Sequence, residues 1–505
     1  MASDMDPNLW IDEVAADHPD RPFVRTPDGQ ALTYAELQAR TSRWASALAE
    51  LGVAGGDRVA AQIDKSVDAL LLYVACLRMG AVFVPINVAN TAAEVEYFLT
   101  DSQPRLAVVR TPDRSALEPL ARRAKVRRIE TLGPAGEGSL SRLVNGASPA
   151  GIPRHGGGPD SPAAIVYTSG TTGRSKGAVL TRRNLASNAV ALAGAWRFSG
   201  SDVLLHTLPL FHVHGLFAAV NTVLASGSSL LLMPRFDAAS VLAHLHEVTV
   251  YMGVPTHYTR LLLEPGLTRA ATAAVRLFVS GSAPLLAETH RQFMERTGQL
   301  ILERYGMTET LMITSNPYEG PRIPGAVGPP LPGVSVRVAD AAGAEGVGTL
   351  EVRGPNVFAG YWRDAAKTRE EFTADGWFKT GDLGQIDAAG FVRIVGRAKD
   401  LVISGGYNVY PREVELELDA LPGVAESAVF GIRHPDLGEG VTAAVVSGPG
   451  TAPTEAELIG ALRARLAGYK IPKRIVFIAE LPRNAMGKVQ KNTLRSAFAS
   501  LYGDS

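Results

Sequence analysis

Hydrophobic residues recur at intervals of three and four just after Thr33, a residue type that can cap a helix. Glu36 stands three positions after Thr33, which is the spacing of a capping box. The repeat contains Leu37, Thr41, Trp44, Leu48 and Leu51, and Gly52 follows it. This pattern predicts an amphipathic helix that begins after Thr33 and ends before Gly52.

Short apolar runs alternate with a longer helical run in residues 58–86. Residues 58–63 and 81–86 predict strands, and residues 67–78 between them predict a helix. A strand–helix–strand order is typical of α/β layers built on a parallel sheet. We therefore expect an α/β fold with parallel-rich layers in this part of the chain.

The pattern changes further along the chain. Residues 133–162 are rich in Gly, Pro and Ser and predict a surface connection into a strand at 163–167. Residues 325–391 contain short alternating strands with frequent Gly and Pro, which indicates a β-rich subdomain. After Asp400 we expect a compact α/β unit of roughly 100 residues, with helices at 411–420 and 455–467 and strands near 425–432 and 442–446.

Composition and charge narrow the class of protein. The chain has 505 residues, which is too long for one ordinary core. Hydrophobic residues make up 46% and charged residues 20%, as in a soluble globular protein. Lys plus Arg and Asp plus Glu both number 50, so no net field would attract nucleic acid or an anionic membrane. We expect small-molecule partners, no nucleic acid and no membrane, while the oligomeric state stays open.

Three features bear on the compartment. Cys76 is the single cysteine, so an internal disulfide is excluded and a reducing cytoplasm is indicated. Residues 1–10 carry acidic residues and no apolar core, unlike a signal peptide. The most apolar segments, residues 70–75 and 230–233, are far shorter than the ~20 residues that cross a membrane. These features predict a cytoplasmic protein.

The strongest chemical signal is a loop rich in Gly, Ser and Thr at residues 167–177. Glycines let backbone N–H groups approach a phosphate, and hydroxyl and lysine side chains add donors and positive charge. The spacing does not fit the Walker A pattern, which disfavours an ordinary P-loop enzyme, and a plain linker is disfavoured because the loop directly follows an apolar strand. We predict a phosphate-binding loop with contacts from Thr168, Ser169, Gly170, Thr171, Thr172, Gly173 and Lys176.

This loop resembles the phosphate-binding motif of the adenylate-forming superfamily, which includes acyl-CoA synthetases, firefly luciferase and peptide-synthetase adenylation domains. Five further motifs resemble that superfamily in the same order, at residues 305–309, 361–362, 380–382, 396–400 and 482–488. The resemblance covers essentially the whole chain. Segments 208–216, 280–291 and 303–310 look most like malonyl-CoA synthetases.

The resemblance implies an ATP-dependent acid:CoA ligase with two half-reactions. A carboxylic acid and ATP would first give an acyl-adenylate and pyrophosphate, and coenzyme A would then displace AMP. In-line attack on the α-phosphate needs a divalent cation and donors near the reacting oxygens. The implied cofactors are therefore ATP, Mg²⁺ and coenzyme A. The implied acid is malonate, with methylmalonate as an alternative.

The resemblance also implies roles for single residues. Lys488 matches the catalytic lysine, and His212 matches the gating position beside the acid. Thr308 would donate to the α-phosphate, and Glu309 would bind Mg²⁺. The other implied nucleotide-site residues are Ser282, Ala283, Pro284, Glu303, Arg304, Tyr305, Asp382 and Arg397. From position alone, an Asp in a Thr-Gly-Asp turn is usually a surface residue.

Two domains and a hinge are implied as well. The large N-terminal domain would comprise residues 1–398 and the small, mobile C-terminal domain residues 399–505, with the hinge at Lys399. Because Lys488 lies on the small domain and the phosphate loop on the large one, catalysis would depend on how the domains face each other. After adenylation, the small domain would rotate and bring a pantetheine-binding loop into place, with Ser404, Gly405, Gly406 and Tyr407.

The acid pocket implied by the resemblance contains residues 209–215, 254–256 and 280–284 and Met307, and the candidates for additional donors are His206, Thr207, His214 and Ser282. A second substrate carboxylate needs a cation or several donors there, because leaving it unpaired costs free energy. Arg291, about two turns into a helix, is the candidate cation, and Arg235 is its rival. The alternative interpretation of Arg291 is an arginine on a surface helix.

Other functions stay open at this point. The enzyme could activate another short-chain acid, or it could transfer the acyl group to a carrier-protein thiol in place of coenzyme A. A non-catalytic sensor of nucleotide or acyl-CoA is disfavoured, because Lys488 and Glu309 are both present.

Overall fold

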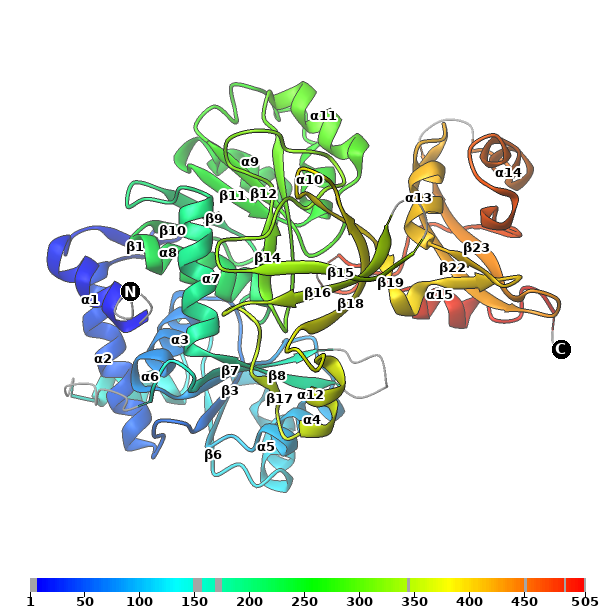
Figure 1. Cartoon of the computed structure of the whole chain (residues 1–505). Coiled ribbons are helices and arrows are strands. Elements are labelled where there is room, and N and C mark those ends of the chain that lie inside the picture. Colours follow the sequence, from blue (N-terminus) through cyan, green and yellow to red (C-terminus); the bar gives the residue numbers. More distant parts are fainter. Residues whose placement is uncertain are drawn as a thin grey trace.

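The computed structural model describes residues 7–148, 157–168, 175–342, 346–448, 452–485 and 487–503. The chain forms a large body and a smaller unit that lies to one side of it (Figure 1). Both combine helices with sheets, which confirms the predicted α/β fold. No described helix is long and apolar enough to cross a membrane.

Two sheets of the body are mainly parallel, with antiparallel pairs at one edge of the seven-stranded sheet and at both edges of the eight-stranded sheet. The seven-stranded sheet has the order β17 (Gly360–Tyr361), β8 (Lys176–Thr181), β7 (Pro162–Thr168), β4 (Val82–Pro85), β3 (Arg58–Gln62), β5 (Leu106–Val109) and β6 (Arg128–Thr131). The eight-stranded sheet has the order β14 (Leu311–Ser315), β13 (Ile301–Met307), β12 (Leu277–Ser280), β11 (Val250–Gly253), β9 (Val203–His206), β10 (Ser229–Leu232), β1 (Pro22–Arg25) and β2 (Ala31–Thr33).

Helices cover these sheets and fill the space between them (Figure 1). The predicted capping box forms, because the Thr33 side chain accepts from the Glu36 N–H while the Glu36 carboxylate accepts from the Thr33 N–H. The helices of the body are α1 (Pro7–Asp17), α2 (Tyr34–Glu50), α3 (Val67–Met79), α4 (Ala92–Ser102), α5 (Arg114–Arg123), α6 (Ser139–Gly146), α7 (Arg182–Ala195), α8 (Asn221–Ser226), α9 (Ala238–His244), α10 (Pro255–Leu261), α11 (Ala287–Thr297) and α12 (Ala365–Glu371).

α3 is apolar on nearly all sides and shares one core cluster with residues of both sheets, as expected for a helix enclosed by the fold. The parallel strands of the two sheets therefore end close to one another. In open α/β sheets, ligands bind at the carboxyl ends of the strands. Those ends carry Lys65 after β3, His206 on β9, Thr256 after β11 and Ser282 after β12.

The predicted β-rich subdomain is a four-stranded antiparallel sheet. Its order is β15 (Ser335–Ala342), β16 (Val347–Arg353), β18 (Phe378–Ile386) and β19 (Val392–Arg397). One prediction was wrong in an earlier part of the chain, because part of the expected surface connection at 133–162 forms α6. Leu140 and Val144 lie one turn apart on α6 and are buried, a pattern too short to stand out among Gly and Pro.

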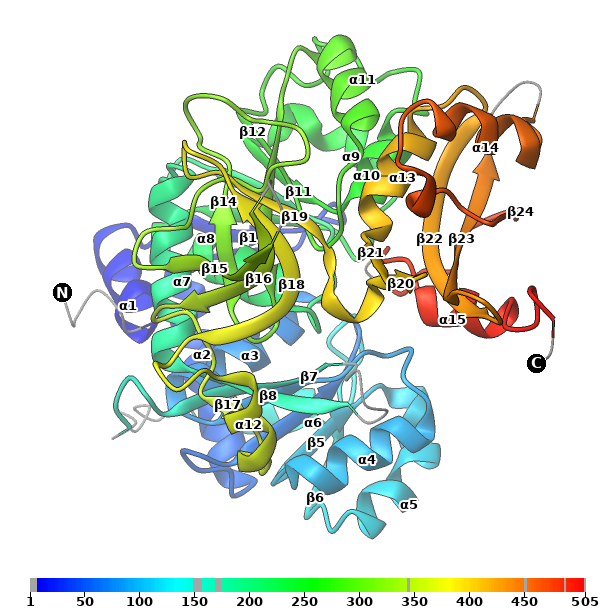
Figure 2. The same cartoon turned by 45° about the vertical axis from the view of Figure 1, so that its right-hand side comes forward.

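The smaller unit has its own core, which includes Val414, Leu418, Val429, Val441 and Leu462. Its helix α13 and strands β20 and β21 lie on the side that faces the body (Figure 2). A separate core is expected of a domain that can move as one body. The elements are β20 (Val402–Ser404), β21 (Tyr407–Val409), α13 (Pro411–Asp419), β22 (Val424–His434), β23 (Gly438–Ser447), α14 (Glu455–Arg463), β24 (Arg474–Phe477) and α15 (Lys491–Ala497).

Candidate active site

The smaller unit presents Lys488 to the body. A tight turn carries this lysine, in which Lys488 N–H donates to the Asn484 side chain at 3.0 Å and Gly487 has a φ of 73°. Gly487 lies against the start of α10, since a Cβ on this glycine would come within 3.0 Å of Thr256 Oγ1. Desolvation, with Arg397 nearby, lowers the Lys488 pKa to about 8. The same lysine acts electrostatically on His212 in the body.

The predicted phosphate loop connects two antiparallel strands. Thr168 ends β7 and pairs with Lys176, which begins β8. Ser169, Gly170, Thr171, Thr172 and Gly173 lie outside the described residues. Lys176 Nζ is 5.6 Å from the ring centre of Tyr361.

Thr308 and Glu309 occupy the tight turn between β13 and β14. Tyr361 Oη donates to Glu309 Oε1 at 3.0 Å, so Tyr361 connects Glu309 to the neighbourhood of Lys176. Burial raises the pKa of the Glu309 carboxyl. A nearby divalent cation would favour its ionised form. Among the described residues, no group of three or more His, Cys, Asp or Glu could hold a metal ion.

Asp382 lies between two residues that both contact its carboxylate. Its carboxylate accepts a hydrogen bond from Tyr305 Oη and forms an ion pair with Arg397 Nε at 2.9 Å. The Asp382 side chain is buried. The structure thus brings together three residues that the sequence assigned to the nucleotide site.

Arg304 lies on the opposite side of β13 from Tyr305, as alternation along a strand requires. Its guanidinium is buried against Gly281, where an added Cβ would lie 2.3 Å from Arg304 Cζ. Burial lowers the Arg304 pKa to about 9, and Nε and Nη2 have no hydrogen-bond partner among the described residues. We expected Arg304 in the nucleotide site, but it lies with the acid-pocket residues.

Several other buried polar atoms around Arg304 also have no hydrogen-bond partner within the described part of the chain. They are His206 Nδ1, Thr207 Oγ1, His214 Nε2 and Ser280 Oγ. His214 Nδ1 contacts Ser282 Oγ at 3.2 Å, and Ser282 has the strained φ of 71°. Buried polar groups are normally paired, so this concentration of unpaired ones indicates a ligand site.

The histidines of this pocket are held in the neutral form. Burial, with Lys65 nearby, lowers the pKa of His206 to about 3, and burial with Arg304 nearby lowers that of His212 to about 4. The pKa of His214 is lowered for the same reasons, burial first and Arg304 second. These rings can therefore donate or accept hydrogen bonds without adding charge, and Arg304 supplies the cation.

Arg291 does not reach this pocket, which corrects the sequence-based expectation. It lies on the exposed face of α11, with 55% of its side chain accessible, and forms ion pairs with Glu288 and Glu295. Helical spacing of three and four residues places both glutamates next to it. The two carboxylates therefore hold the guanidinium at the surface.

The other expected site residues lie on β13 or in the segment after β12. Met307 ends β13, and Ala283 and Pro284 follow Ser282. Glu303 is buried, and its Oε1 accepts from the Gly325 N–H at 3.1 Å. Burial raises the Glu303 pKa to about 7, while Arg412 of the smaller unit acts in the opposite direction.

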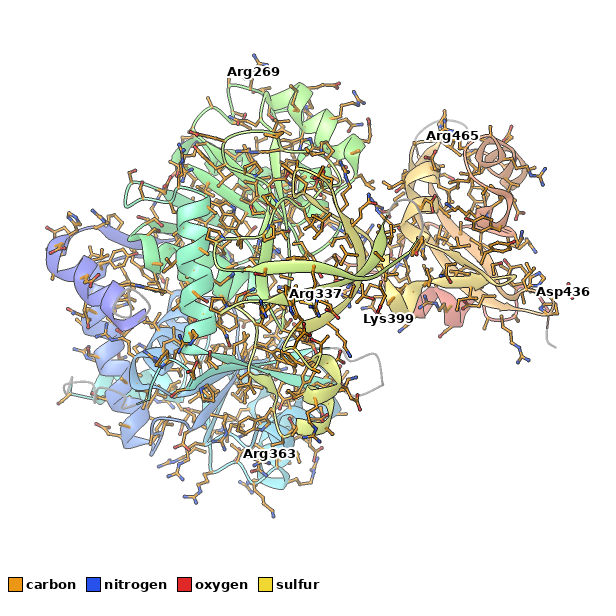
Figure 3. All side chains as sticks on the ribbon, in the orientation of Figure 1. Arg269, Arg337, Arg363, Lys399, Asp436 and Arg465 are labelled. Atoms are coloured by element: carbon orange, nitrogen blue, oxygen red, sulfur yellow. The ribbon has the colours of Figure 1, made fainter. Side chains whose placement is uncertain are left out.

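The predicted pantetheine loop is a tight hairpin between β20 and β21. Gly405 and Gly406 have φ values of 58° and 82°, which glycine adopts readily in a hairpin turn. Ser404 is buried, whereas Tyr407 is 60% exposed and stacks on Tyr469 at 4.8 Å. Lys399 lies where the body meets the smaller unit (Figure 3), and its pKa is lowered by desolvation and by Arg397.

Lys65 is a site residue that sequence reasoning missed. Lys65 Nζ donates to the backbone oxygen of His206 at 2.8 Å, and desolvation places its pKa well below the usual value. It also lies near His257, whose ring stacks on Phe236. No motif marks Lys65, but a lysine after the carboxyl end of a predicted parallel strand was the available signal.

Comparison with known proteins places two family profiles on the chain. The AMP-binding enzyme profile matches residues 11–362, and the AMP-binding enzyme C-terminal domain profile matches residues 413–488. The first covers the phosphate loop and Glu309, and the second ends at Lys488.

Similar proteins differ in the acids their names contain. The indoleacetate–CoA ligase of Aromatoleum aromaticum is 35% identical over 512 residues, 98% of either chain. The mitochondrial malonate–CoA ligase of Mus musculus is 36% identical over 92% of this chain and 86% of its own length. ATP-bound MatB from Rhodopseudomonas palustris is 51% identical, with a TM-score of 0.96 over 99% of this chain and 100% of its own. The apo form of MatB gives a TM-score of 0.85, so the arrangement here is closer to the ATP-bound form.

Proposed function

We propose, from the premise that this chain belongs to the AMP-binding enzyme family, that it is an ATP-dependent malonate:CoA ligase. It is an AMP-forming acid–thiol ligase, as its relatives among the CoA ligases indicate. In this reaction malonate and ATP give malonyl-adenylate and pyrophosphate, and coenzyme A then gives malonyl-CoA and AMP.

The observation that carries malonate is the buried, unpaired guanidinium of Arg304. A simple fatty acid would bring only apolar groups to this pocket and would leave the guanidinium unpaired. The distal carboxylate of malonate would accept hydrogen bonds from Arg304 Nε and Nη2 in a bidentate pair. His206, Thr207 and His214 offer further neutral groups to it. The names of the malonate–CoA ligases among the relatives support the same acid.

The reacting carboxylate would lie between this pocket and Lys488. In our proposal the Lys488 ammonium stabilises the charge that develops as the acid attacks the α-phosphate, a role that suits a compact point charge. Thr308 donates to a phosphate oxygen, and His212 borders the acid. Mg²⁺, when bound through Glu309, would offset the charge of the phosphates. The proposal has Asp382 accept hydrogen bonds from the ribose, and the contacts of its carboxylate with Arg397 and Tyr305, which fix its orientation, support this.

The same proposal assigns thioester formation to a second orientation of the small domain. Rotation about Lys399 would withdraw Lys488 and bring the hairpin from Ser404 to Tyr407 to the acyl-adenylate. The higher TM-score to ATP-bound MatB supports assigning the orientation seen here to adenylation.

We place the enzyme in the cytoplasm, where the single buried cysteine Cys76 stays reduced. Methylmalonate is the second candidate acid, because one methyl group changes binding by only ~1 to 3 kcal/mol.

Release of pyrophosphate by the purified chain tests the proposal. The assay contains ATP, Mg²⁺ and one acid at a time: malonate, methylmalonate, acetate, propionate or octanoate. We expect the highest kcat/KM with malonate or methylmalonate, and we expect free coenzyme A to complete the reaction. Faster turnover of octanoate would remove the malonate assignment. If a holo-carrier protein were acylated and coenzyme A were not, the acyl acceptor would be the carrier-protein thiol.

A further inference from the structure

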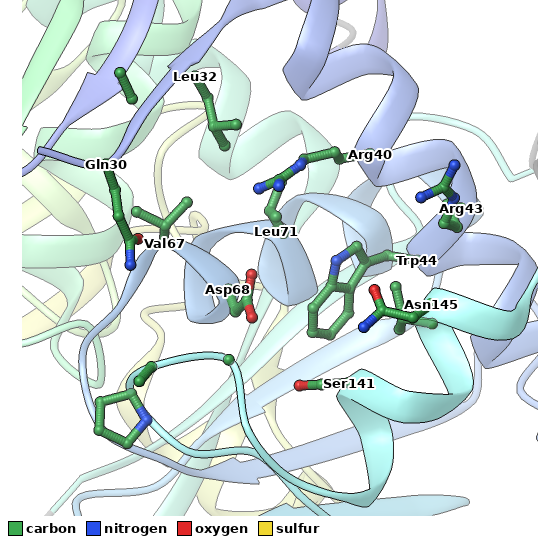
Figure 4. Close-up of a pocket in the computed structure, with 15 residues that line it drawn as sticks. Gln30, Leu32, Arg40, Arg43, Trp44, Val67, Asp68, Leu71, Ser141 and Asn145 are labelled. Atoms are coloured by element: carbon green, nitrogen blue, oxygen red, sulfur yellow. The ribbon is translucent and has the colours of Figure 1, made fainter.

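A second cavity lies away from the candidate active site, between α2, α3 and α6 (Figure 4). Its volume is about 430 Å³, within the range of roughly 300 to 1,000 Å³ of small-molecule sites. Strand and loop residues at 30–32 and 134–136 close its remaining sides. No step of the proposed reaction uses any residue of this cavity.

Each of the three helices presents neighbouring residues of one face to the cavity. Residues three or four positions apart lie on the same side of a helix, so the pattern can be followed in the sequence. The helical lining consists of Arg40, Arg43 and Trp44 from α2, Val67, Asp68 and Leu71 from α3, and Ser141, Val144 and Asn145 from α6.

Positive charge gathers on the α2 side of the cavity. Within the described residues, neither Arg40 nor Arg43 forms an ion pair or a side-chain hydrogen bond, although Arg40 acts electrostatically on Asp68. Asp68 lies in the first turn of α3, and burial raises the pKa of its carboxyl. The cavity therefore combines two available guanidinium groups with the Asp68 carboxylate on a different wall, and the Glu137 carboxylate also acts on Asp68.

Ser141 gives independent evidence for a ligand. Its side chain is only 7% exposed, and its Oγ has no hydrogen-bond partner in the described part of the chain. In Figure 4 the Ser141 hydroxyl, the Asp68 carboxylate and the Arg40 guanidinium point into the same space. A buried hydroxyl without a partner costs free energy, and a bound polar molecule would remove that cost.

We propose that this cavity binds a phosphate monoester whose body carries hydroxyl groups, such as a sugar phosphate. Arg40 and Arg43 would bind the phosphate through charge-assisted hydrogen bonds. The hydroxyl groups of the ligand would donate to Asp68 and pair with Ser141 and Asn145. A simple dicarboxylate fits less well, because it has no donor for Asp68 and would be repelled by it.

Isothermal titration of the full chain with glucose 6-phosphate tests this proposal. Saturating AMP is present throughout, so that the candidate nucleotide site is occupied. We expect one saturable site that binds glucose 6-phosphate at least about tenfold more tightly than inorganic phosphate or glucose alone. Absence of saturable binding, or equal affinity for inorganic phosphate, would overturn the proposal.

Variants locate the binding. The double variant Arg40→Ala/Arg43→Ala should weaken binding by about 100-fold, and Ser141→Ala by about fivefold. Arg142→Ala removes an exposed arginine next to Ser141 that does not line the cavity, and it should leave binding unchanged. Equal affinity of the wild type and the double variant would place the ligand elsewhere. Because both arginines of the double variant are exposed, its fold should be retained.

Discussion

Arg304 and Tyr305 are neighbours on β13 but belong to two regions that differ in how completely their polar groups are paired. Tyr305 joins Asp382 and Arg397 in a cluster whose charges neutralise each other. Arg304 lies on the other side of the strand among polar atoms without partners. We call these the nucleotide cluster and the acid pocket.

The difference indicates which region depends on its ligand. The nucleotide cluster is fixed by its own contacts, so it is preorganised for a part of the reaction that all adenylating enzymes share. The acid pocket holds a cation that only the right acid would pair. Discrimination between acids should therefore come from the acid pocket, and affinity for ATP from the nucleotide cluster.

Lys488, which acts on both regions, should show the largest effect. Lys488→Ala should reduce the rate of pyrophosphate release by about 10³-fold, because the developing charge loses its cation. Thioester formation from supplied malonyl-adenylate should stay within about threefold of wild type, since Lys488 would leave the site for that step. Stopped-flow assays of the two half-reactions measure this. Equal loss in both would argue against two orientations of the small domain.

A substitution in the acid pocket tests whether this pocket, and not the nucleotide cluster, discriminates between acids. Arg304→Met should reduce kcat/KM for malonate by about 100-fold, or about 3 kcal/mol, while kcat/KM for propionate should not fall. Arg291→Ala is the matched control and should change neither value, because Arg291 is paired at the surface. Asp382→Asn, in the nucleotide cluster, should raise KM for ATP and leave the ratio between the two acids unchanged. If Arg291→Ala alone lowered the malonate value, the pocket cation would be Arg291.

The smallest expected effect is a change in kcat/KM for adenylation with pH. The Lys488 pKa of about 8 means that its ammonium is lost as pH rises through 8, far below the usual range for lysine. The kcat/KM for adenylation, which reports the free enzyme, should therefore fall about tenfold per pH unit above that value. Lys488→Arg should be slower but should not show this fall, because arginine stays charged. A wild-type profile that is flat to pH 10 would mean that Lys488 keeps an ordinary pKa.

Motifs in the sequence predicted the nucleotide cluster better than the acid pocket. Asp382, Arg397 and Tyr305 come from three separate motifs, and the structure brings them together. Arg291 was assigned through the resemblance to malonyl-CoA synthetases, although its position alone favoured the surface. Sequence does not show which way a helical side chain points or that two glutamates flank it in space. Strand alternation could have separated Arg304 from Tyr305, because neighbours on a strand face opposite sides.

Contacts between distant segments were not predictable. Lys65 reaches His206 only because β3 and β9, in different sheets, end close together. Local patterns were enough to predict the fold class, the β-rich subdomain and most elements of the small unit. Each of these helices and strands buries an apolar face that recurs periodically in the sequence. α6 was not predictable in this way, because its two buried apolar residues are too few to form a visible repeat.

Two ion pairs define the length of the segment that could act as a hinge between the body and the small unit. Arg397 is tied to Asp382 in the body at 2.9 Å, and Asp400 is tied to Arg495 on α15 of the small unit, also at 2.9 Å. Only Ala398 and Lys399 lie between these two anchored residues. A reorientation of the small unit that preserved both pairs would have to be absorbed mainly by the backbone torsions of two residues. A hinge of two residues permits a large rotation of the small unit but little translation. Lys488 would therefore leave the site, and the Ser404–Tyr407 hairpin would enter it, by rotation about a nearly fixed point.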